Sequence, residues 1–448
     1  MSQSRTRLPA PAVAAQGLEW VQTCQFDAGH LTSDGGLAWV QQADLELGLC
    51  SALAAQIPEW RRGPVRHSLE TLVRQRVYQI VCGYEDQDDA DTLRRDPLLK
   101  LVCGRLPSSA ADDLASQPTL SRLENAVDRR SCYRLAHTLV GLYLDARERA
   151  GGVPAHLLLD LDSTDDATHG AQEGSAYHGY YQQHMYHPLL IFDGETDQLL
   201  TAVLRPGTVH ASRGVVSVLK RLVRRIRMRW PDVTIELRAD SGFAVPALYE
   251  WCEAEGIAYT LGLATNPRLA AAAHPLLDHA QAQHEQTGQK VRMAGETAYA
   301  AGTWTHERRV VYKAEALDQG PNLRFVVTTR TDPDPLALYE WYVQRGTPEQ
   351  WIDDLKHACF ADRLSCHRFW ANQFRLLLHA AAYWLLDTLR RWLRQLGVAP
   401  LRLDTLRLRL LKIGGWVRWQ VAGFRLHLAS SHPAEPLWHL LITRFQAP

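Results

Sequence analysis

Three acidic residues stand where their carboxylates could act together. Asp162 ends the apolar segment 156–162 (HLLLDLD), Asp240 directly follows the segment 233–239 (VTIELRA), and Glu349 lies early in a helix expected from Thr347. Carboxylates that converge from separate elements bind hard divalent cations such as Mg²⁺, which prefers oxygen ligands and keeps waters that can react. Two such metals about 4 Å apart can activate an attacking oxygen and stabilise a leaving oxygen. This is the chemistry of phosphodiester cleavage and strand transfer.

Each of these positions also has a purely structural interpretation. Asp160 lies on the same face of a period-two strand as the first acid and is therefore a rival first ligand. Asp165 and Asp166 are typical of a turn. Asp240 could cap a strand-to-helix turn, and Glu349 could complement a helix dipole. For each acid taken singly, the structural interpretation is at least as good as the metal-binding one. Taken together on the topology predicted below, the acids favour a metal site.

The elements that must position these acids follow from the spacing of apolar residues. The segment after Gly151-Gly152 predicts the order βββ-α-β-α-β. The elements are strands 156–162, 186–192 and 199–204, a helix over 213–229, a strand 233–239, a helix from Ser241 to about Glu255, and a strand 257–263. This order, followed by a later helix, is what a ribonuclease H-like α/β fold requires. In that fold the strands that end at Asp162 and Asp240 are parallel neighbours, so both carboxylates emerge at one edge.

The remaining periodicities divide the chain into five regions. Before residue 151 the pattern is helical, with clear amphipathic segments at 68–81, capped by Ser68, and at 132–149. We expect a helical N-terminal region (1–150), a first part of the catalytic domain (151–265), a β-rich insertion (266–335), a second part of the catalytic domain (336–396) and a basic C-terminal region (397–448). The insertion contains strand candidates at 297–304, 309–313 and 324–329. The second part contains helices at 336–344, from Thr347 (a capping box with Pro348 and Gln350), and at 373–396.

Composition narrows the class of protein. The 448 residues carry 49 Lys+Arg and 49 Asp+Glu, but the stretch from residue 357 onward has 13 cations against four acids, which weakly indicates a polyanionic partner. The longest nearly apolar run, 376–386, is far below the about 20 residues that span a bilayer, so we expect a soluble intracellular protein. The eight cysteines form no C-x-x-C and predict reduced, mostly buried thiols; Cys359 and Cys366 match no standard zinc spacing.

Three motifs of the chain resemble those of one known family. Tyr342-x2-Arg345-x3-Glu349-x6-Lys356 fits the Y-R-E-K signature of bacterial insertion-sequence transposases of the DDE class. The segment 161–164 (LDST) resembles their first-acid motif, and 237–243 (LRADSGF) resembles their second. The chain is similar to the cut-and-paste group of this family from about Leu31 to Phe445.

The resemblance implies roles for individual residues. Asp162, Asp240 and Glu349 would be catalytic and would hold two Mg²⁺, for which Mn²⁺ can substitute. Tyr342, Arg345 and Lys356 would contact DNA phosphates near the scissile bond, and Arg238 is a further candidate DNA contact. Trp304, in the insertion, would stack on a base flipped out of a hairpin end; packing in the insertion's own core is the safer interpretation.

The resemblance also implies a function and partners. We expect a transposase that cleaves and joins double-stranded DNA at terminal inverted repeats and in the target, as a homodimer in the bacterial cytoplasm, at the nucleoid when bound. The alternatives are a structure-selective metal-dependent nuclease and a DNA-binding relic without catalysis. One departure concerns the signature helix: Gly346-Thr347-Pro348 predicts a break between Arg345 and Glu349. Lys356 is expected two turns after Glu349, on the same face.

Overall fold

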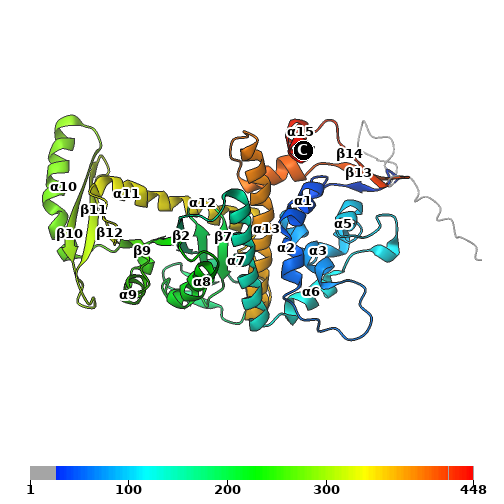
Figure 1. Cartoon of the computed structure of the whole chain (residues 1–448), viewed down its shortest axis with the longest axis horizontal. Helices are drawn as coiled ribbons and strands as arrows, with labels where there is room; N and C mark the ends of the chain where they lie inside the picture. Colours follow the sequence, from blue (N-terminus) through cyan, green and yellow to red (C-terminus); the bar gives the residue numbers. More distant parts are fainter. Residues whose placement is uncertain (1–26, 422, 447–448) are drawn as a thin grey trace, which may run out of the picture.

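The main sheet has eight strands and is mixed. The computed structural model describes residues 27–421 and 423–446 (Figure 1). The strand order is β10-β11-β12-β9-β8-β2-β6-β7. In chain order the strands are β2 (His156–Ser163), β6 (Leu189–Asp193), β7 (Leu199–Val203), β8 (Thr234–Ala239), β9 (Ala258–Leu263), β10 (Val291–Tyr299), β11 (Arg308–Leu317) and β12 (Gly320–Thr328).

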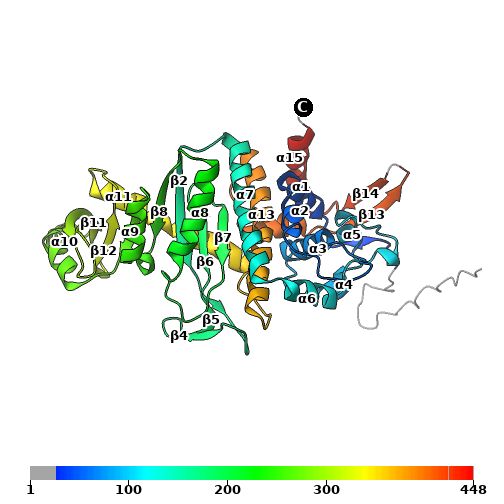
Figure 2. The same cartoon turned by 60° about the horizontal axis from the view of Figure 1, so that its bottom comes forward.

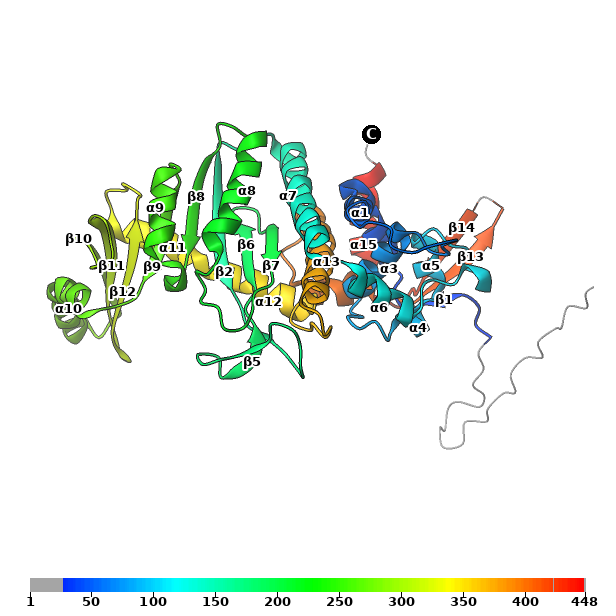
Figure 3. The same cartoon turned by 90° about the horizontal axis from the view of Figure 1, so that it is seen from below.

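The arrangement around β2 confirms the predicted order βββ-α-β-α-β. β2 is parallel to β8 and antiparallel to β6, and β8 is parallel to β9. The two crossovers are α8 (Val215–Arg229) and α9 (Pro246–Ala254). Residues 157–162 of β2 are all buried, as expected for a strand covered on both faces. Figure 3 shows α7 (Arg129–Gly151), α8 and α9 on one face, and α11 (Pro335–Val343) with α12 (Thr347–Asp353) on the other.

Two predicted elements near the acids were wrong in extent. The strand expected over 186–192 is split: β5 (Gln183–Tyr186) ends before Pro188 and pairs with β3 (Asp166–Ala167) and β4 (Ala176–His178) in a small separate sheet (Figure 2). The helix expected from Ser241 begins only at Pro246. Residues 241–243 form a single 3-10 turn, capped by the Asp240 carboxylate, which accepts from the Gly242 amide at 2.9 Å.

The segment 266–335 contains a long helix that its sequence did not predict. Helix α10 (Pro267–Thr287) is capped by Asn266 and has Pro275 in its interior. Its alanine-rich sequence has only weak apolar periodicity, which is why the helix escaped prediction. The three predicted strands exist with shifted bounds. They continue the main sheet rather than forming one of their own, because β12 pairs with β9. Helices α10 and α11 both pack on β10 and β11, from opposite faces (Figures 1 and 3).

The N-terminal helices pack on one side of a long central helix. That helix, α13 (Phe369–Gln395), contacts α3 (Leu69–Val81) on one side and β7 on the other, so it joins the helical part to the sheet (Figure 1). The predicted cap of α3 is confirmed, since Ser68 accepts from the Thr71 amide at 3.1 Å. The other helical elements here are α1 (Leu37–Leu47), α2 (Leu49–Ala54), α3 (Leu69–Val81), α4 (Ala90–Leu93), α5 (Pro97–Val102), a 3-10 turn (Ala110–Asp112) and α6 (Gln117–Ala126).

The C-terminal residues fold back onto the N-terminal helices. Strand β13 (Gly415–Gln420) pairs with β14 (Gly423–Leu428) and with β1 (Leu31–Thr32). The ring of Trp438, on α15 (Glu435–Gln446), lies 5.3 Å from that of Trp39 on α1. The link from α13 passes through α14 (Leu403–Leu406) and a π-helical turn (Arg407–Leu411). The region at 397–448 therefore completes the helical N-terminal part.

Much of the basic excess after residue 357 is neutralised inside the fold. Arg390 binds Asp354 and Asp387, each at 2.7 Å, and Lys412 binds Asp34 at 2.7 Å. Arg375–Glu124, Arg394–Asp197 and Arg402–Asp353 join cations of this stretch to acids before residue 357, and Arg391–Asp387 lies within the stretch. The charge asymmetry therefore reflects intramolecular pairing more than a polyanion-binding tail.

Two further expectations concern membranes and thiols. No helix among the described residues is both long and apolar enough to cross a bilayer. Seven cysteines are buried and free, as predicted, and Cys24 lies outside the described residues.

A buried histidine in α13 should make the protein less stable in acid. His379 is fully buried, its Nδ1 contacts the Cys359 carbonyl oxygen at 2.5 Å, and burial holds its pKa well below the usual value. Below about pH 6.5 the unfolded state therefore binds a proton at His379 that the folded state does not bind. The contribution of the neutral, buried histidine to the unfolding free energy is present above that pH and is lost as the pH falls. We expect His379→Gln to narrow the difference in unfolding free energy between pH 7.5 and 5.5 by about 1 kcal/mol, measured by urea titration. The exposed His279→Gln should leave that difference unchanged.

Candidate active site

The first two acids lie side by side at one edge of the sheet. Leu161 of β2 is opposite Ala239 of β8 in a parallel pair, and Asp162 and Asp240 each come one residue later. Parallel neighbours end at the same edge, so the two carboxylates emerge together, as the sequence predicted. Asp162 is only 6% exposed, and burial raises its pKa to about 6; Arg345 opposes this shift and the nearby charge of Asp240 adds to it. The two carboxylates are thus electrostatically coupled.

An arginine joins the first acid to the third. Arg345 donates from Nη2 to Oδ2 of Asp162 at 2.9 Å, and its Nη1 lies 3.5 Å from Oε1 of Glu349. The Glu349 side chain is 65% exposed and the Arg345 side chain 18%. Glu349 is therefore held beside the buried aspartate by a guanidinium that contacts both carboxylates. Arg345 favours the ionised form of Asp162.

The signature helix changes its winding twice. A 3-10 turn (Gln344–Gly346) follows α11, and α12 is followed by a π-helical turn (Asp354–Ala358). The predicted break before Pro348 is thus a tightening of the helix, and the chain stays helical through Gly346. Gly346, and not Thr347, occupies the cap position, which corrects the predicted capping box. The 3-10 turn places Arg345, and the π turn places Lys356, whose position on such a turn is typical of functional sites.

Tyr342 lies against the second acid's strand. Its hydroxyl donates to the Ala239 carbonyl at 3.3 Å, and burial raises its pKa above the ordinary range. A Cβ at Gly262 of β9 would come within 2.7 Å of the Tyr342 hydroxyl oxygen, so this glycine makes room for the tyrosine. The role of Gly262 was not predicted, although a lone glycine inside a strand is a signal for close approach.

Lys356 binds the residues that follow the first acid. Its Nζ lies 3.0 Å from both Oδ1 and the carbonyl oxygen of Asp165, and 3.3 Å from Oγ1 of Thr164. Gln183 donates to the other carboxylate oxygen of Asp165 at 2.8 Å. Asp165, predicted as a plain turn residue, is therefore the partner of the signature lysine. The adjacent Asp166 is buried, and neither of its carboxylate oxygens has a hydrogen-bond partner within the described residues.

Comparison with known proteins assigns the family. The sequence matches the model of the family described as Transposase DDE domain group 1 over residues 20–447. The chain belongs to this transposase family. A solved structure of the piggyBac transposase synaptic complex with hairpin DNA is similar, with 11% identity, a TM-score of 0.44, and coverage of 85% of this chain and 79% of that chain. A comparison with curated proteins gives no match.

In this family member, Asp160, the rival first ligand, forms a buried ion pair with Arg238. Asp160 and Arg238, 1% and 2% exposed, form two hydrogen bonds of 2.7 Å through Nε and Nη2. Arg238 also donates to the Trp341 carbonyl at 3.0 Å, and its guanidinium lies 5.0 Å from that ring. This arrangement leaves Asp162 as the first acid of the site. It also favours a structural role for Arg238, docking α11 onto the sheet, over the DNA contact expected from the motif.

Trp304 is packed within an aromatic cluster. Its ring lies 5.1 Å from that of Tyr249 and 5.3 Å from that of Tyr299, and the Arg308 guanidinium is 5.3 Å away. The side chain is half-buried, on the loop between β10 and β11. These contacts favour the packing interpretation over base stacking.

The three acids of this transposase fit a divalent cation by their donor chemistry. Carboxylate oxygens are the ligands that Mg²⁺ prefers, and two of the acids are already adjacent. Within residues 27–421 and 423–446, however, no three His, Cys, Asp or Glu side chains lie close enough together to hold a metal ion. The Arg345 guanidinium supplies positive charge between Asp162 and Glu349 instead. A site that uses all three acids therefore requires Arg345 to exchange its partners.

Proposed function

We propose that this chain is a DNA transposase that cleaves and joins DNA at the ends of a bacterial insertion sequence. One observation carries the proposal: in a member of a DDE transposase family, Asp162 and Asp240 share one sheet edge and Arg345 holds Glu349 beside them. The reaction would be in-line displacement at phosphorus, by water in the nick and by the freed 3′-hydroxyl in the joining steps. A hairpin intermediate is one route of excision.

The fold of the catalytic part is proposed to be ribonuclease H-like. Three antiparallel strands, β7-β6-β2, are extended by the parallel strands β8 and β9, with α8 and α9 as crossovers. In this proposal the regions 151–265 and 336–396 form the catalytic domain, which the segment 266–335 interrupts. The region 1–150 serves DNA binding and assembly, and 397–448 is a basic C-terminal region.

The proposed roles follow from charge and position. Asp162, Asp240 and Glu349 would hold Mg²⁺, two per site, and Mn²⁺ can replace it. When bound, the metal would activate the attacking oxygen and stabilise the leaving one. Arg345 suits a phosphate because its fork can form two bonds, whereas Lys356 offers a point charge. Both now pair with aspartates, so a DNA phosphate would compete with Asp162 for Arg345 and with Asp165 for Lys356.

The cellular setting is part of the proposal. The partners would be double-stranded DNA, as terminal inverted repeats and target, and a second copy of the chain in the synaptic complex. The protein would act in the bacterial cytoplasm, at the nucleoid.

The deciding experiment uses a labelled duplex that carries the ends of the element. With Mg²⁺, we expect nicking followed by joined or hairpin products, and we expect Glu349→Gln to abolish all of them. Glu250→Gln, an exposed acid on α9, is the matched control and should retain activity. Nicking without joining would favour the structure-selective nuclease, and binding without cleavage would favour the DNA-binding relic.

Removing the charge of Arg345 should strengthen metal binding. Its guanidinium lies 2.9 Å from Asp162 and opposes a second cation at the same carboxylate. We expect Arg345→Gln to lower the apparent Kd for Mn²⁺ by about three- to tenfold, measured by electron paramagnetic resonance of free Mn²⁺. Arg324→Gln, an exposed arginine on β12, should leave the Kd unchanged. Weaker Mn²⁺ binding by Arg345→Gln would show that the arginine organises the acids for the metal.

A further inference from the structure

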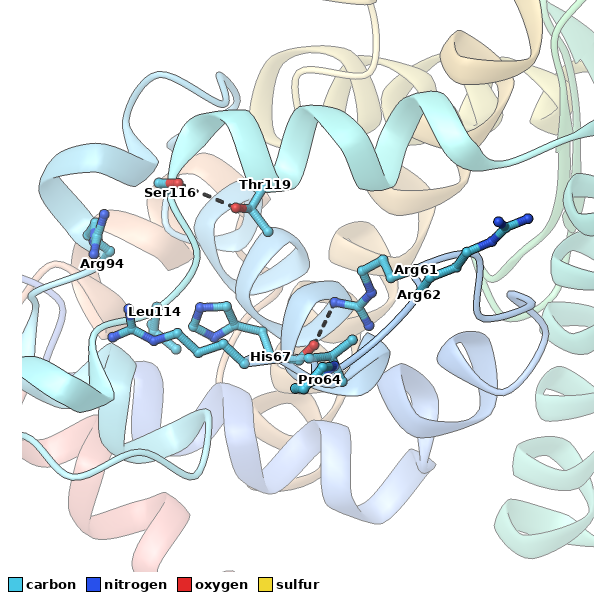
Figure 4. A pocket seen from close by; sticks show the side chains of 10 residues that line it. Arg61, Arg62, Pro64, His67, Arg94, Leu114, Ser116 and Thr119 are labelled. Atoms are coloured by element: carbon cyan, nitrogen blue, oxygen red, sulfur yellow. Dashed lines mark hydrogen bonds between the residues drawn. The ribbon is translucent and has the colours of Figure 1, made fainter.

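A basic cavity lies in the N-terminal helical part. Its volume is about 310 Å³, and it is formed by the loop before α3, the end of α4 and the start of α6 (Figure 4). The polar side chains that line it are Arg61, Arg62, Arg66, His67, Arg94, Ser116 and Thr119. None of these residues belongs to the acidic site on the sheet.

Two polar atoms at this cavity lack partners. His67 is 7% exposed, and its Nδ1 has no hydrogen-bond partner within the described part of the chain. The buried Nε of Arg94 is likewise without an acceptor there. Burial, reinforced by the surrounding arginines, lowers the pKa of His67 to about 4, so the ring is neutral near pH 7. A neutral imidazole carries one N–H, which can donate to an oxyanion when it is on Nδ1.

Carboxylates neutralise only part of the positive charge. Arg61 is fully paired, because its Nε and Nη2 contact the Glu59 carboxylate at 2.7 and 2.6 Å. Asp113 is shared by three cations: Lys100 at 3.2 Å, Arg94 at 3.7 Å and Arg95 at 3.8 Å. One carboxylate among three cations leaves this side of the cavity positive.

Two more arginines have no carboxylate partner among the described residues. Arg66 donates to the backbone carbonyls of Ala110 and Ala111, the latter at 2.6 Å. Arg62 is exposed and makes no hydrogen bond or ion pair within the described chain, and Figure 4 shows its side chain extending along the rim, away from His67. The cavity is thus a positive hollow with a further free cation beside it. A hollow of this charge attracts anions.

The anion would be bound by side chains. The first amides of α6 are already used: the Gln117 amide binds Asp91 at 3.1 Å, and the Thr119 amide binds the Ser116 carbonyl at 2.9 Å. The Ser116 and Thr119 hydroxyls face each other at 3.4 Å (Figure 4) and can both turn toward a ligand. Guanidinium forks, an imidazole N–H and two hydroxyls form a donor set for tetrahedral phosphate oxygens.

We propose that this cavity binds a backbone phosphate of DNA, as a contact separate from the catalytic acids, with Arg62 reaching the next phosphate along the strand. The assignment of the phosphate to DNA rests on the proposed function. Inorganic phosphate shares the same chemistry, and the experiment must separate the two.

The first test measures duplex binding by the full chain at several salt concentrations. We expect Arg66→Gln and Arg62→Gln each to weaken binding about three- to tenfold, and each to reduce the slope of log K against log salt by about one. Arg130→Gln, an exposed arginine on α7 outside the cavity, should match the parent in both quantities. Unchanged affinity and slope in both cavity variants, with folding verified by thermal melting, would overturn the proposal.

The second test needs no substitution. Phenylglyoxal modifies accessible arginines, and mass spectrometry of peptides reports Arg62 and Arg66 separately. We expect the duplex to protect both arginines at low salt and millimolar inorganic phosphate to protect Arg66 only weakly. Protection by inorganic phosphate without protection by the duplex would overturn the DNA assignment, and protection by neither would overturn the site.

The two proposals fail differently. Suppose that the parent cleaves DNA, that substitution of the cavity arginines leaves DNA affinity unchanged, and that the duplex does not protect them from phenylglyoxal. The cavity proposal then fails and the transposase proposal stands. If the parent binds the duplex through these arginines but never cleaves it, the transposase proposal fails and the cavity proposal stands. If the parent does not bind DNA at all, both fail.

Discussion

Asp162→Asn should reduce cleavage of the labelled end duplex by roughly three orders of magnitude, a loss of about 4 kcal/mol of transition-state stabilisation. The change keeps the shape of the side chain but removes the charge that faces Asp240 and accepts from Arg345. A metal bound by carboxylates would lose one of its anionic ligands, and Glu349 would lose the arginine-mediated link to the sheet. The measurement is a single-turnover cleavage rate with saturating protein.

The matched control for this prediction is Asp232→Asn. Asp232 is an exposed acid just before β8, at the opposite end of the strand from Asp240, so the same chemical change is made away from the site. It should cleave at the parental rate. Mn²⁺ binding gives an independent readout, since Asp162→Asn should weaken it and Asp232→Asn should not. Cleavage by Asp162→Asn within tenfold of the parent would remove this aspartate from the catalytic set.

Arg238→Met should destabilise the protein by about 3–5 kcal/mol. The substitution leaves the Asp160 carboxylate buried beneath the sheet edge without its two 2.7 Å hydrogen bonds, and it releases the Trp341 carbonyl of α11. An unpaired charge in the interior is far less favourable than a paired one, so the loss exceeds the value of an exposed ion pair. The unfolding free energy is measured by denaturant titration.

Two further variants isolate the origin of that loss. Arg227→Met breaks the exposed Arg227–Glu255 pair, on the opposite face of the sheet, and should cost less than about 1 kcal/mol. The double change Asp160→Leu with Arg238→Met removes both charges and should recover most of the stability. Equal losses for the single and double variants would mean that packing around Trp341 matters more than the ion pair.

The sequence predicted the parts of the site that depend on the regular sheet. The apolar runs before Asp162 and Asp240 occur in a βββ-α-β-α-β order, and in the fold expected from that order the two strands are parallel neighbours. Side-chain contacts between residues far apart in the sequence could not be predicted in this way. The Arg345–Asp162 and Lys356–Asp165 contacts span more than 180 positions and depend on where a 3-10 turn and a π turn place each cation.

Arg238 shows what a motif alone cannot predict. It lies two residues before Asp240 in the second-acid motif, which suggested a DNA contact. Because β8 is buried from Ile235 to Ala239, a charge there also needs an internal partner. Asp160, on the neighbouring strand at the same level, provides it. The basic stretch after residue 357 was only a weak indication of a polyanion, and its ion pairs, such as Lys412–Asp34, join residues too far apart in the sequence to be predicted.

The pairing of β1 with β13 has a consequence for biosynthesis. Leu31 and Thr32 find their strand partners only at Gly415 and Trp416, and Trp39 finds its aromatic neighbour at Trp438. In a nascent chain whose first helices have emerged, this edge stays uncovered until residues 415–438 have been translated. A copy with a premature stop codon shortly after α13 would therefore retain every acid of the site and yet leave the ribosome with an incomplete N-terminal part, a target for proteolysis.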